Sequence, residues 1–113
     1  MNAPTNSPLE AGGIIYNVTI KVDGTIADNW LIWLLHEHIP AIMSTQCFTS
    51  YKVVKLMDMD ETEGPTYAIQ YSAKDIADYT RYRTEYAADM YRQLVQKWGQ
   101  QVVWFETAMQ VVH

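Results

Sequence analysis

The sequence has little cysteine, few basic residues and no long hydrophobic run. A single cysteine among 113 residues, Cys47, excludes an internal disulfide and a cysteine-rich metal site. Eight Lys and Arg against thirteen Asp and Glu give a net charge of -5, without a basic cluster for nucleic acid or an anionic membrane. No apolar run approaches the ~20 residues of a membrane span, and the start lacks the features of a secretory signal. We therefore expect a cytoplasmic protein without nucleic-acid or membrane partners.

Hydrophobic residues make up 49% of the sequence and charged residues 19%, which is ordinary for a globular domain. A chain of 113 residues is the size of one domain. Residues 1–13 contain mostly small polar residues, Gly and Pro, and too little apolar surface to offset the entropy of ordering them. We predict a disordered leader over 1–13 and a single domain over 14–113.

The most distinctive stretch is Trp30–Pro40, where six consecutive apolar residues lead into His36 and His38. Helical periodicity places Trp30, Leu34 and His38 on one face and Ile32, Trp33 and His36 on or near the other. We predict a helix from about Ile26 to Ile39, ended by Pro40, with a possible further turn over Ala41–Thr45. A helix that is apolar on two sides needs cover on both, so the second cover is expected to come from a second subunit.

Alternating apolar residues predict strands on both sides of this helix. The first strand covers Ile14–Val22, the second Cys47–Met57 with a bulge near Thr49, and the third Thr66–Ser72. A second helix is predicted to begin after a capping pair of Ser72 and Asp75 and to run to Trp98. The last strand covers Val102–Val112.

The resulting order is βαββαβ, the α+β ferredoxin-like arrangement with a four-stranded antiparallel sheet and two helices on one face. The other sheet face is predicted to carry Ile15, Ala68, Trp104 and Val112. Such an apolar face would be unfavourable in water, and burial is worth about 25 cal/mol per Å². We therefore expect a homodimer.

Two polar side chains, His38 and Arg83, fall on helix faces that are otherwise apolar. His36 and His38 point about 200° apart on a helix, so they cannot share a metal ion, and no metal site is predicted. The partners available to His38 and Arg83 include strand residues such as Asn17, Gln70 and Glu106. The residues that could form a pocket between helices and sheet are His38, Arg83, Asn17, Trp30, Tyr79, Tyr86 and Gln70.

Two interpretations of these residues remain open. In the first, His38 caps a carbonyl near Pro40 and Arg83 extends to the rim with its stem on the core. In the second, both face a cavity that binds a small aromatic or acidic molecule, with His38 as proton acceptor or ligand contact and Arg83 as anion partner. Strand parity alone does not decide whether Asn17 faces the helices.

Several segments also resemble a family of bacterial proteins that is defined as a domain of unknown function. The resemblance rests on Ile15-Tyr-Asn-Val-Thr19, His38-Ile-Pro40, Cys47-Phe48, Gly64-Pro-Thr-Tyr-Ala-Ile-Gln-Tyr71 and Lys97-Trp-Gly99. That family looks like a branch of the dimeric α/β-barrel superfamily, with antibiotic-biosynthesis-type monooxygenases, haem-degrading oxygenases and muconolactone-isomerase-like proteins. The resemblance implies two sheets packed face to face across a dimer axis.

Haem is not expected, although the haem-degrading relatives use an Asn on the first strand, a Trp and a His. The chain has Asn17 and several Trp residues, but no histidine on its second helix, where the iron ligand of those relatives lies. No cofactor is predicted. The sequence favours a protein that binds a small organic molecule between helices and sheet. The alternatives are a structural dimeric interaction module without catalytic activity, and a cofactor-free monooxygenase or isomerase like the superfamily relatives. A deep, partly polar cavity containing His38 would favour binding, and a cavity filled by tyrosine rings would favour the structural module.

Overall fold

The computed structural model describes residues 9–113, so most of the predicted leader 1–13 lies outside the described residues. The elements follow the order β1 (Ile14–Val22), α1 (Ala27–Trp33), a π-helical turn (Leu34–His38), α2 (Ile39–Met43), β2 (Ser50–Lys55), β3 (Thr66–Ala73), α3 (Ile76–Glu85), α4 (Ala87–Trp98), a 3₁₀ turn (Gly99–Gln101) and β4 (Val102–Gln110). Just before β1, Gly12 N–H donates to Val111 O at 2.8 Å, which ties this segment to the end of β4. Within residues 9–113, no helix combines the length and apolar character needed to span a membrane.

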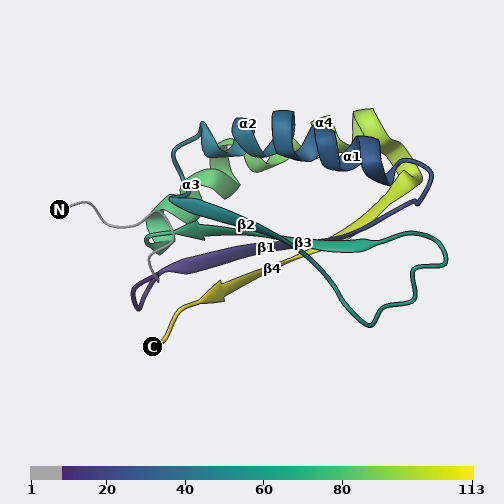
Figure 1. Cartoon of the computed structure of the whole chain (residues 1–113). Helices are drawn as coiled ribbons and strands as arrows, with labels where there is room; N and C mark the ends of the chain where they lie inside the picture. The colour runs from purple at the N-terminus through teal and green to yellow at the C-terminus, as the bar shows by residue number, and fades with distance from the viewer. Residues whose placement is uncertain (1–8) are drawn as a thin grey trace.

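The four strands form one sheet in the order β2-β3-β1-β4, and every neighbouring pair is antiparallel. Figure 1 shows all the helices on one side of this sheet, with the other side free of helices. The predicted fold, a ferredoxin-like α+β domain, is confirmed. Because β1 and β3 are the inner strands, their helix-facing residues form the centre of the core.

Strand register decides which side chains face the helices. Tyr16 and Ile20 of β1 lie opposite Tyr71 and Tyr67 of β3, and all four point toward the helices. The prediction that Trp104 faces the open side is wrong: Trp104 pairs with Ile20 and therefore lies on the helix side. The open face carries instead Val103, Phe105 and Met109, which alternate with the helix-facing residues of β4.

The prediction that Pro40 ends the first helix is also wrong, because the helix continues through α2 to Met43. Immediately before Pro40 the chain makes a π-helical turn, in which Ile39 N–H donates to Leu34 O, five residues back. A proline in a regular helix lacks one donor and its ring crowds the carbonyl four residues earlier. The wider turn relieves this crowding. The helix therefore changes locally from a four-residue to a five-residue hydrogen-bond spacing and continues past Pro40.

Other element boundaries also differ from the prediction, and β4 ends at Gln110 rather than Val112. The second helix is interrupted at Tyr86, which has φ -126° and ψ -27° and separates α3 from α4. The N-cap of α3 is Asp75 and not Ser72. The Asp75 carboxylate accepts a hydrogen bond from Asp78 N–H at 2.9 Å. Strand β2 begins at Ser50 rather than Cys47, since the residues before it form the loop that leaves α2.

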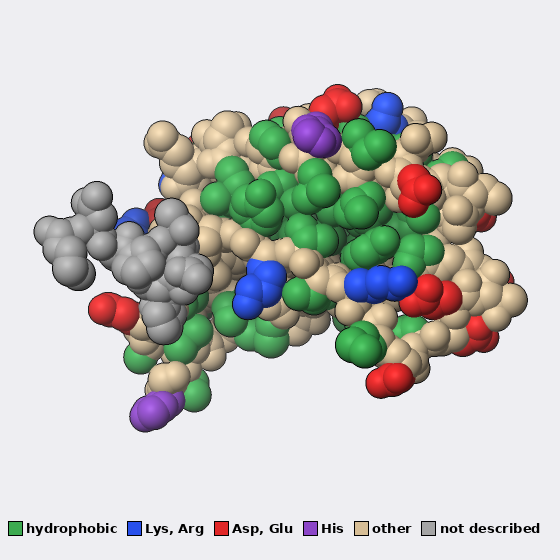
Figure 2. All heavy atoms as spheres, in the orientation of Figure 1, with side chains coloured by type: hydrophobic (Ala, Val, Ile, Leu, Met, Phe, Trp, Pro, Cys, Tyr) green, Lys and Arg blue, Asp and Glu red, His purple; other side chains and the backbone are tan. Residues whose placement is uncertain are grey.

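The second apolar side of the first helix is covered by the same chain. Trp33 is buried, and its ring packs edge-on against Trp98 of α4 with centroids 5.8 Å apart. The predicted need for a second subunit at Trp33 is therefore wrong. Ile32 and Leu35 remain exposed on the outer side of the helix. Figure 2 shows hydrophobic side chains gathered on the visible side of the molecule, below the charged side chains at the top of the helical layer.

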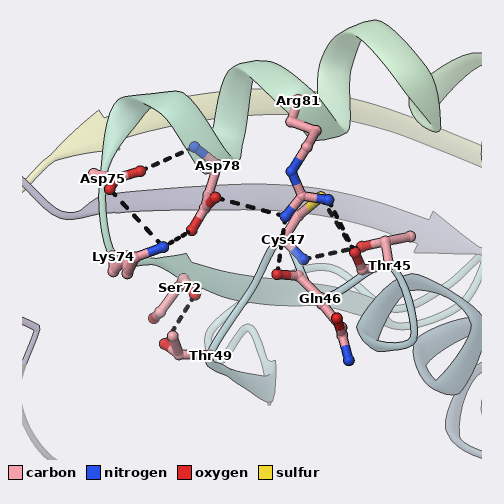
Figure 3. Close-up of polar contacts among 9 residues, drawn as sticks. All are labelled: Thr45, Gln46, Cys47, Thr49, Ser72, Lys74, Asp75, Asp78 and Arg81. Carbon is pink, nitrogen blue, oxygen red and sulfur yellow. Dashed lines mark hydrogen bonds and ion pairs between the residues drawn. The ribbon is translucent and has the colours of Figure 1, made fainter.

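Arg81 fixes the loop between α2 and β2 to helix α3 (Figure 3). Its guanidinium donates to Thr45 O and Gln46 O, both at 3.1 Å, and lies 3.5 Å from the Asp78 carboxylate. Gln46 has a positive φ of 61°, so the loop turns sharply at this point. The next residues, Cys47 and Phe48, are both buried. By fixing this loop, Arg81 helps to place Phe48 among the tyrosines of the core.

Candidate functional site

A narrow cavity lies between the helices and the sheet. The cavity has a volume of about 30 Å³, which is enough for a few atoms at most. Aliphatic residues from β1, β3, α2 and α4 contribute part of the wall. The aromatic part of the wall consists of Tyr16, Trp30, Tyr71, Tyr82, Tyr91 and Trp104. No Lys, Arg, Asp or Glu of the described chain lines the cavity.

Two nitrogens of residues that line the cavity lack a hydrogen-bond partner among residues 9–113: Trp30 Nε1 and His38 Nδ1. Trp30 is 1% exposed, so its indole N–H is removed from bulk solvent. Buried polar atoms are usually paired, and an unpaired one costs about 1 to 3 kcal/mol. Among the residues that line the cavity, two therefore carry a buried nitrogen without a partner in the described chain.

The π-helical turn positions His38 against its own helix. The imidazole stacks on the Trp33 ring with centroids 4.6 Å apart and planes 22° apart. Burial lowers the pKa of His38 to about 4, so the imidazole is neutral at physiological pH. The alternative in which His38 caps a carbonyl near Pro40 finds no support at Nδ1, which has no hydrogen-bond partner among residues 9–113.

Beside the cavity, an ion pair joins α3 to β4. Arg83 Nη1 lies 2.6 Å from Glu106 Oε1 and also donates to the Tyr91 hydroxyl at 3.2 Å. The Tyr16 hydroxyl donates to the same Glu106 oxygen at 2.5 Å. The Arg83 side chain is 38% exposed, and its guanidinium lies 5.8 Å from the Tyr16 ring centroid. Arg83 thus reaches the rim with Glu106 as its partner, and it is absent from the cavity wall.

The protonation state of Tyr16 follows from this setting. Burial raises the pKa of its hydroxyl far above the ordinary value, and the hydrogen bond to Glu106 raises it further. Tyr16 therefore stays a neutral phenol that gives its proton to the Glu106 carboxylate in a hydrogen bond. Burial likewise raises the pKa of Tyr71 and of Tyr82, so these hydroxyls are also neutral.

The predicted pocket residues divide between two faces of the sheet. His38 and Trp30 line the cavity. Asn17 and Gln70 lie opposite each other on β1 and β3 and face the open side, since their neighbours Tyr16 and Tyr71 face the helices. Asn17 Nδ2 donates to Thr19 Oγ1 at 2.9 Å on that open side. The structure therefore separates the two amides from His38.

Two further predicted residues lie behind the cavity wall. The Tyr79 ring is 5.8 Å from the Tyr16 ring, and the Tyr86 ring is 6.5 Å from the Tyr82 ring. Neither Tyr79 nor Tyr86 belongs to the wall itself. They support the tyrosines that do line the cavity.

The pocket predicted from the sequence did not include five aromatic residues of the wall: Tyr16, Tyr71, Tyr82, Tyr91 and Trp104. The signal for Tyr16 was present, because strand alternation places it with Val18 and Ile20 on the helix-facing side. The signal for Tyr82 and Tyr91 was hidden by the break at Tyr86, which changes the helical phase between α3 and α4. Only the folded helices bring both rings to one cavity.

Comparison with known proteins places the chain in a family. The family described as Domain of unknown function (DUF4286) matches residues 13–112, nearly the whole chain. The chain belongs to this family. DUF4286 carries no stated activity, and no match was found among curated protein sequences.

Solved structures of the same fold come from several organisms. A variant of SnoaB, described as a cofactor-independent oxygenase from Streptomyces nogalater, has a TM-score of 0.65 at 10% identity over 91% of this chain and 96% of that one. A dimeric ferredoxin-like protein from an uncultured marine organism has a TM-score of 0.59 at 14% identity over 89% and 96%. An ethyl tert-butyl ether D (EthD) family protein from Bacillus halodurans has a TM-score of 0.60 at 9% identity over 83% of this chain and 96% of that one. At these identities the likeness concerns the fold, which this DUF4286 chain shares.

Proposed function

We propose that this DUF4286 protein binds a small organic molecule in the cavity between helices and sheet. The observation that carries the proposal is a pair of buried nitrogens, Trp30 Nε1 and His38 Nδ1, which have no hydrogen-bond partner within residues 9–113 and belong to residues that line a largely aromatic cavity. Binding sites commonly combine apolar walls with a few polar groups that orient the ligand. A ligand atom that pairs with these nitrogens would remove the cost of leaving them unsatisfied.

The small size of the cavity means that ligand binding must move its walls. The break at Tyr86 lies between the helices that supply Tyr82 and Tyr91, so these helices are joined without a continuous helical hydrogen-bond ladder. A small shift at this joint would widen the cavity on the side of α3 and α4. SnoaB, a protein of similar fold, is described as a cofactor-independent oxygenase. That description concerns SnoaB, and it supports the proposal at the level of the fold.

A thermal-shift screen of aromatic and heteroaromatic metabolites tests the proposal. Binding to the native state alone raises the melting temperature with ligand concentration. We expect at least one compound to stabilise the wild type, and His38→Phe to reduce that shift. His36→Phe is the matched control because His36 lies on the same helix with its side chain exposed. The proposal would be overturned if no compound of a broad screen raised the melting temperature and none changed the NMR signals of the residues that line the cavity.

We also propose that the chain forms a homodimer through the open face of the sheet. Val103 and Phe105 of β4 are 69% and 62% exposed on this face, where the half-buried Ile15 continues the apolar surface. Exposed apolar area of this kind is typical of an interface. The marine ferredoxin-like neighbour is described as dimeric, which supports a second copy as the partner. A dimer without any ligand would favour the alternative of a structural module.

A further inference from the structure

The chemistry of the cavity wall narrows the class of ligand, provided that the proposed binding function holds. The wall has no charged side chain of the described residues, and His38 is neutral at physiological pH because burial lowers its pKa. Six aromatic rings supply flat apolar surface. Such a wall stabilises an aromatic ring by apolar contact and by ring packing.

The nearest candidate for an anion partner is already engaged. Arg83 is paired with Glu106 at 2.6 Å, and Glu106 also accepts from Tyr16. A carboxylate in the cavity would therefore either be buried without a counter-charge or have to displace Glu106. Burying an unpaired charge is costly, and removing one partner of an existing ion pair adds to that cost. This argues against the acidic ligand that the sequence alone left open.

The unpaired indole specifies what the ligand must offer instead. Trp30 Nε1 can only donate a hydrogen bond, so its partner must be an acceptor. His38 can donate or accept at Nδ1 according to its tautomer, so it adapts to either kind of ligand atom. We propose that the ligand is an uncharged aromatic molecule with a hydrogen-bond-accepting oxygen, of which an aryl ketone is the simplest example.

Three single-ring probes of similar shape separate the possibilities: acetophenone, which is uncharged and has an acceptor, benzoate, which is an anion, and ethylbenzene, which has no acceptor. Binding is followed by NMR of the ¹⁵N-labelled full chain, whose four tryptophans give separate indole N–H signals. The Trp30 signal is identified from its proximity to Tyr67, whose ring is 5.4 Å away. This assignment does not depend on a Trp30 variant folding.

We expect acetophenone to move the Trp30 indole proton downfield, as a new hydrogen bond does, and to bind at least about tenfold more tightly than benzoate. Ethylbenzene should perturb cavity residues without that downfield shift. Trp98 is the internal control, because its Nε1 is also buried without a partner among residues 9–113 but Trp98 does not line the cavity. Its signal should stay in place with all three probes.

The outcomes distinguish this inference from the proposed function. Binding of benzoate as tight as that of acetophenone would overturn the uncharged ligand and leave the cavity function standing. Binding of ethylbenzene as tight as that of acetophenone, with no downfield shift at Trp30, would overturn the acceptor requirement. If none of the probes and no compound of the broader screen changes a cavity signal, the proposed function itself fails. Trp30→Phe, where it folds, should remove the preference for acetophenone over ethylbenzene.

Discussion

Arg81 and Arg83 are two residues apart on α3 and serve opposite sides of the molecule. Arg81 binds the Thr45 and Gln46 carbonyls and fixes the loop that leaves α2, whereas Arg83 binds Glu106 on β4. Residues two apart on a helix point about 200° away from each other, so one helix can connect to both edges of the domain. Arg83 is therefore the arginine that contacts the surroundings of the cavity. One of its partners, Tyr91, lines the cavity, and the other, Glu106, accepts a hydrogen bond from Tyr16, which also lines it.

The first prediction concerns the coupling between Arg83 and Glu106. We expect Glu106→Gln to lower the free energy of unfolding by about 1 to 2 kcal/mol, because the ion pair is lost and the Tyr16 hydroxyl bonds to a weaker acceptor. Urea unfolding of Glu106→Gln, Arg83→Gln and the double variant gives the coupling energy. The pair Arg92 and Asp89 is the control: both side chains are more than 60% exposed, so their coupling should stay below about 0.5 kcal/mol. Equal coupling in the two pairs would contradict the prediction.

The second prediction concerns the pH dependence of stability caused by His38. Its pKa in the folded chain is about 4, below the ordinary value of 6.5, so between these pH values the unfolded chain binds more protons. The free energy of unfolding should therefore fall as the pH drops from about 6.5 to about 4, with a contribution from His38 on the order of 1 to 3 kcal/mol.

Urea unfolding at several pH values in this window measures that contribution. Compared with the wild type, His38→Gln should lose less stability on acidification. His36→Gln, a substitution at an exposed position of the same helix, is measured alongside as the control. Carboxylates such as Asp78, whose pKa is lowered by its hydrogen bond to Lys74, titrate in every variant and cancel in the comparison. Identical slopes for wild type and His38→Gln would show that His38 is not buried as a neutral group.

The third prediction concerns the dimer. Light scattering of the wild type should give a mass of about 26 kDa, twice the 13.0 kDa of one chain. Phe105→Lys should shift this mass toward the monomer, because a charge on β4 would be buried in the proposed interface. Ile32→Lys is the control: Ile32 is 59% exposed, close to the 62% of Phe105, but lies on the outer side of the helices. A monomeric wild type at micromolar concentration would rule out the proposed interface.

The fourth prediction concerns Gly64, at the turn that leads into β3. Its φ is +140°, and a Cβ atom here would lie 1.9 Å from Val22 O. Gly64→Ala should therefore destabilise the fold by about 3 kcal/mol or more, because backbone atoms would have to move. At Gly12, which also has a positive φ but no atom within 4 Å of a built Cβ, alanine should cost only about 1 kcal/mol. Urea unfolding of both variants measures the difference, and similar losses would contradict the steric explanation.

Local sequence patterns were enough to predict the order of strands and helices and the alternation of side chains along each strand. Ile14–Val22 was predicted with the bounds that the structure has, because β-branched residues with a period of two define a strand locally. The same local rule grouped Tyr16 with Ile20. The βαββαβ order then left the ferredoxin-like fold as the arrangement that buries one face of the sheet under both helices.

Features that depend on pairing between distant segments could not be read from local patterns and became visible in the folded chain. Alternation separates Trp104 from Phe105, but only the register with β1 shows that Trp104 faces the helices. In the same way, register placed Asn17 on the open side, and packing of α3 on β4 selected Glu106 as the partner of Arg83. Helical periodicity grouped His38 correctly with Trp30 and Leu34, which line the same cavity. The break at Tyr86 rotates the residues that follow it, so periodicity could not place Tyr91. The cavity wall combines residues from several strands and helices. The orientation of these elements relative to one another is fixed only when they pack together.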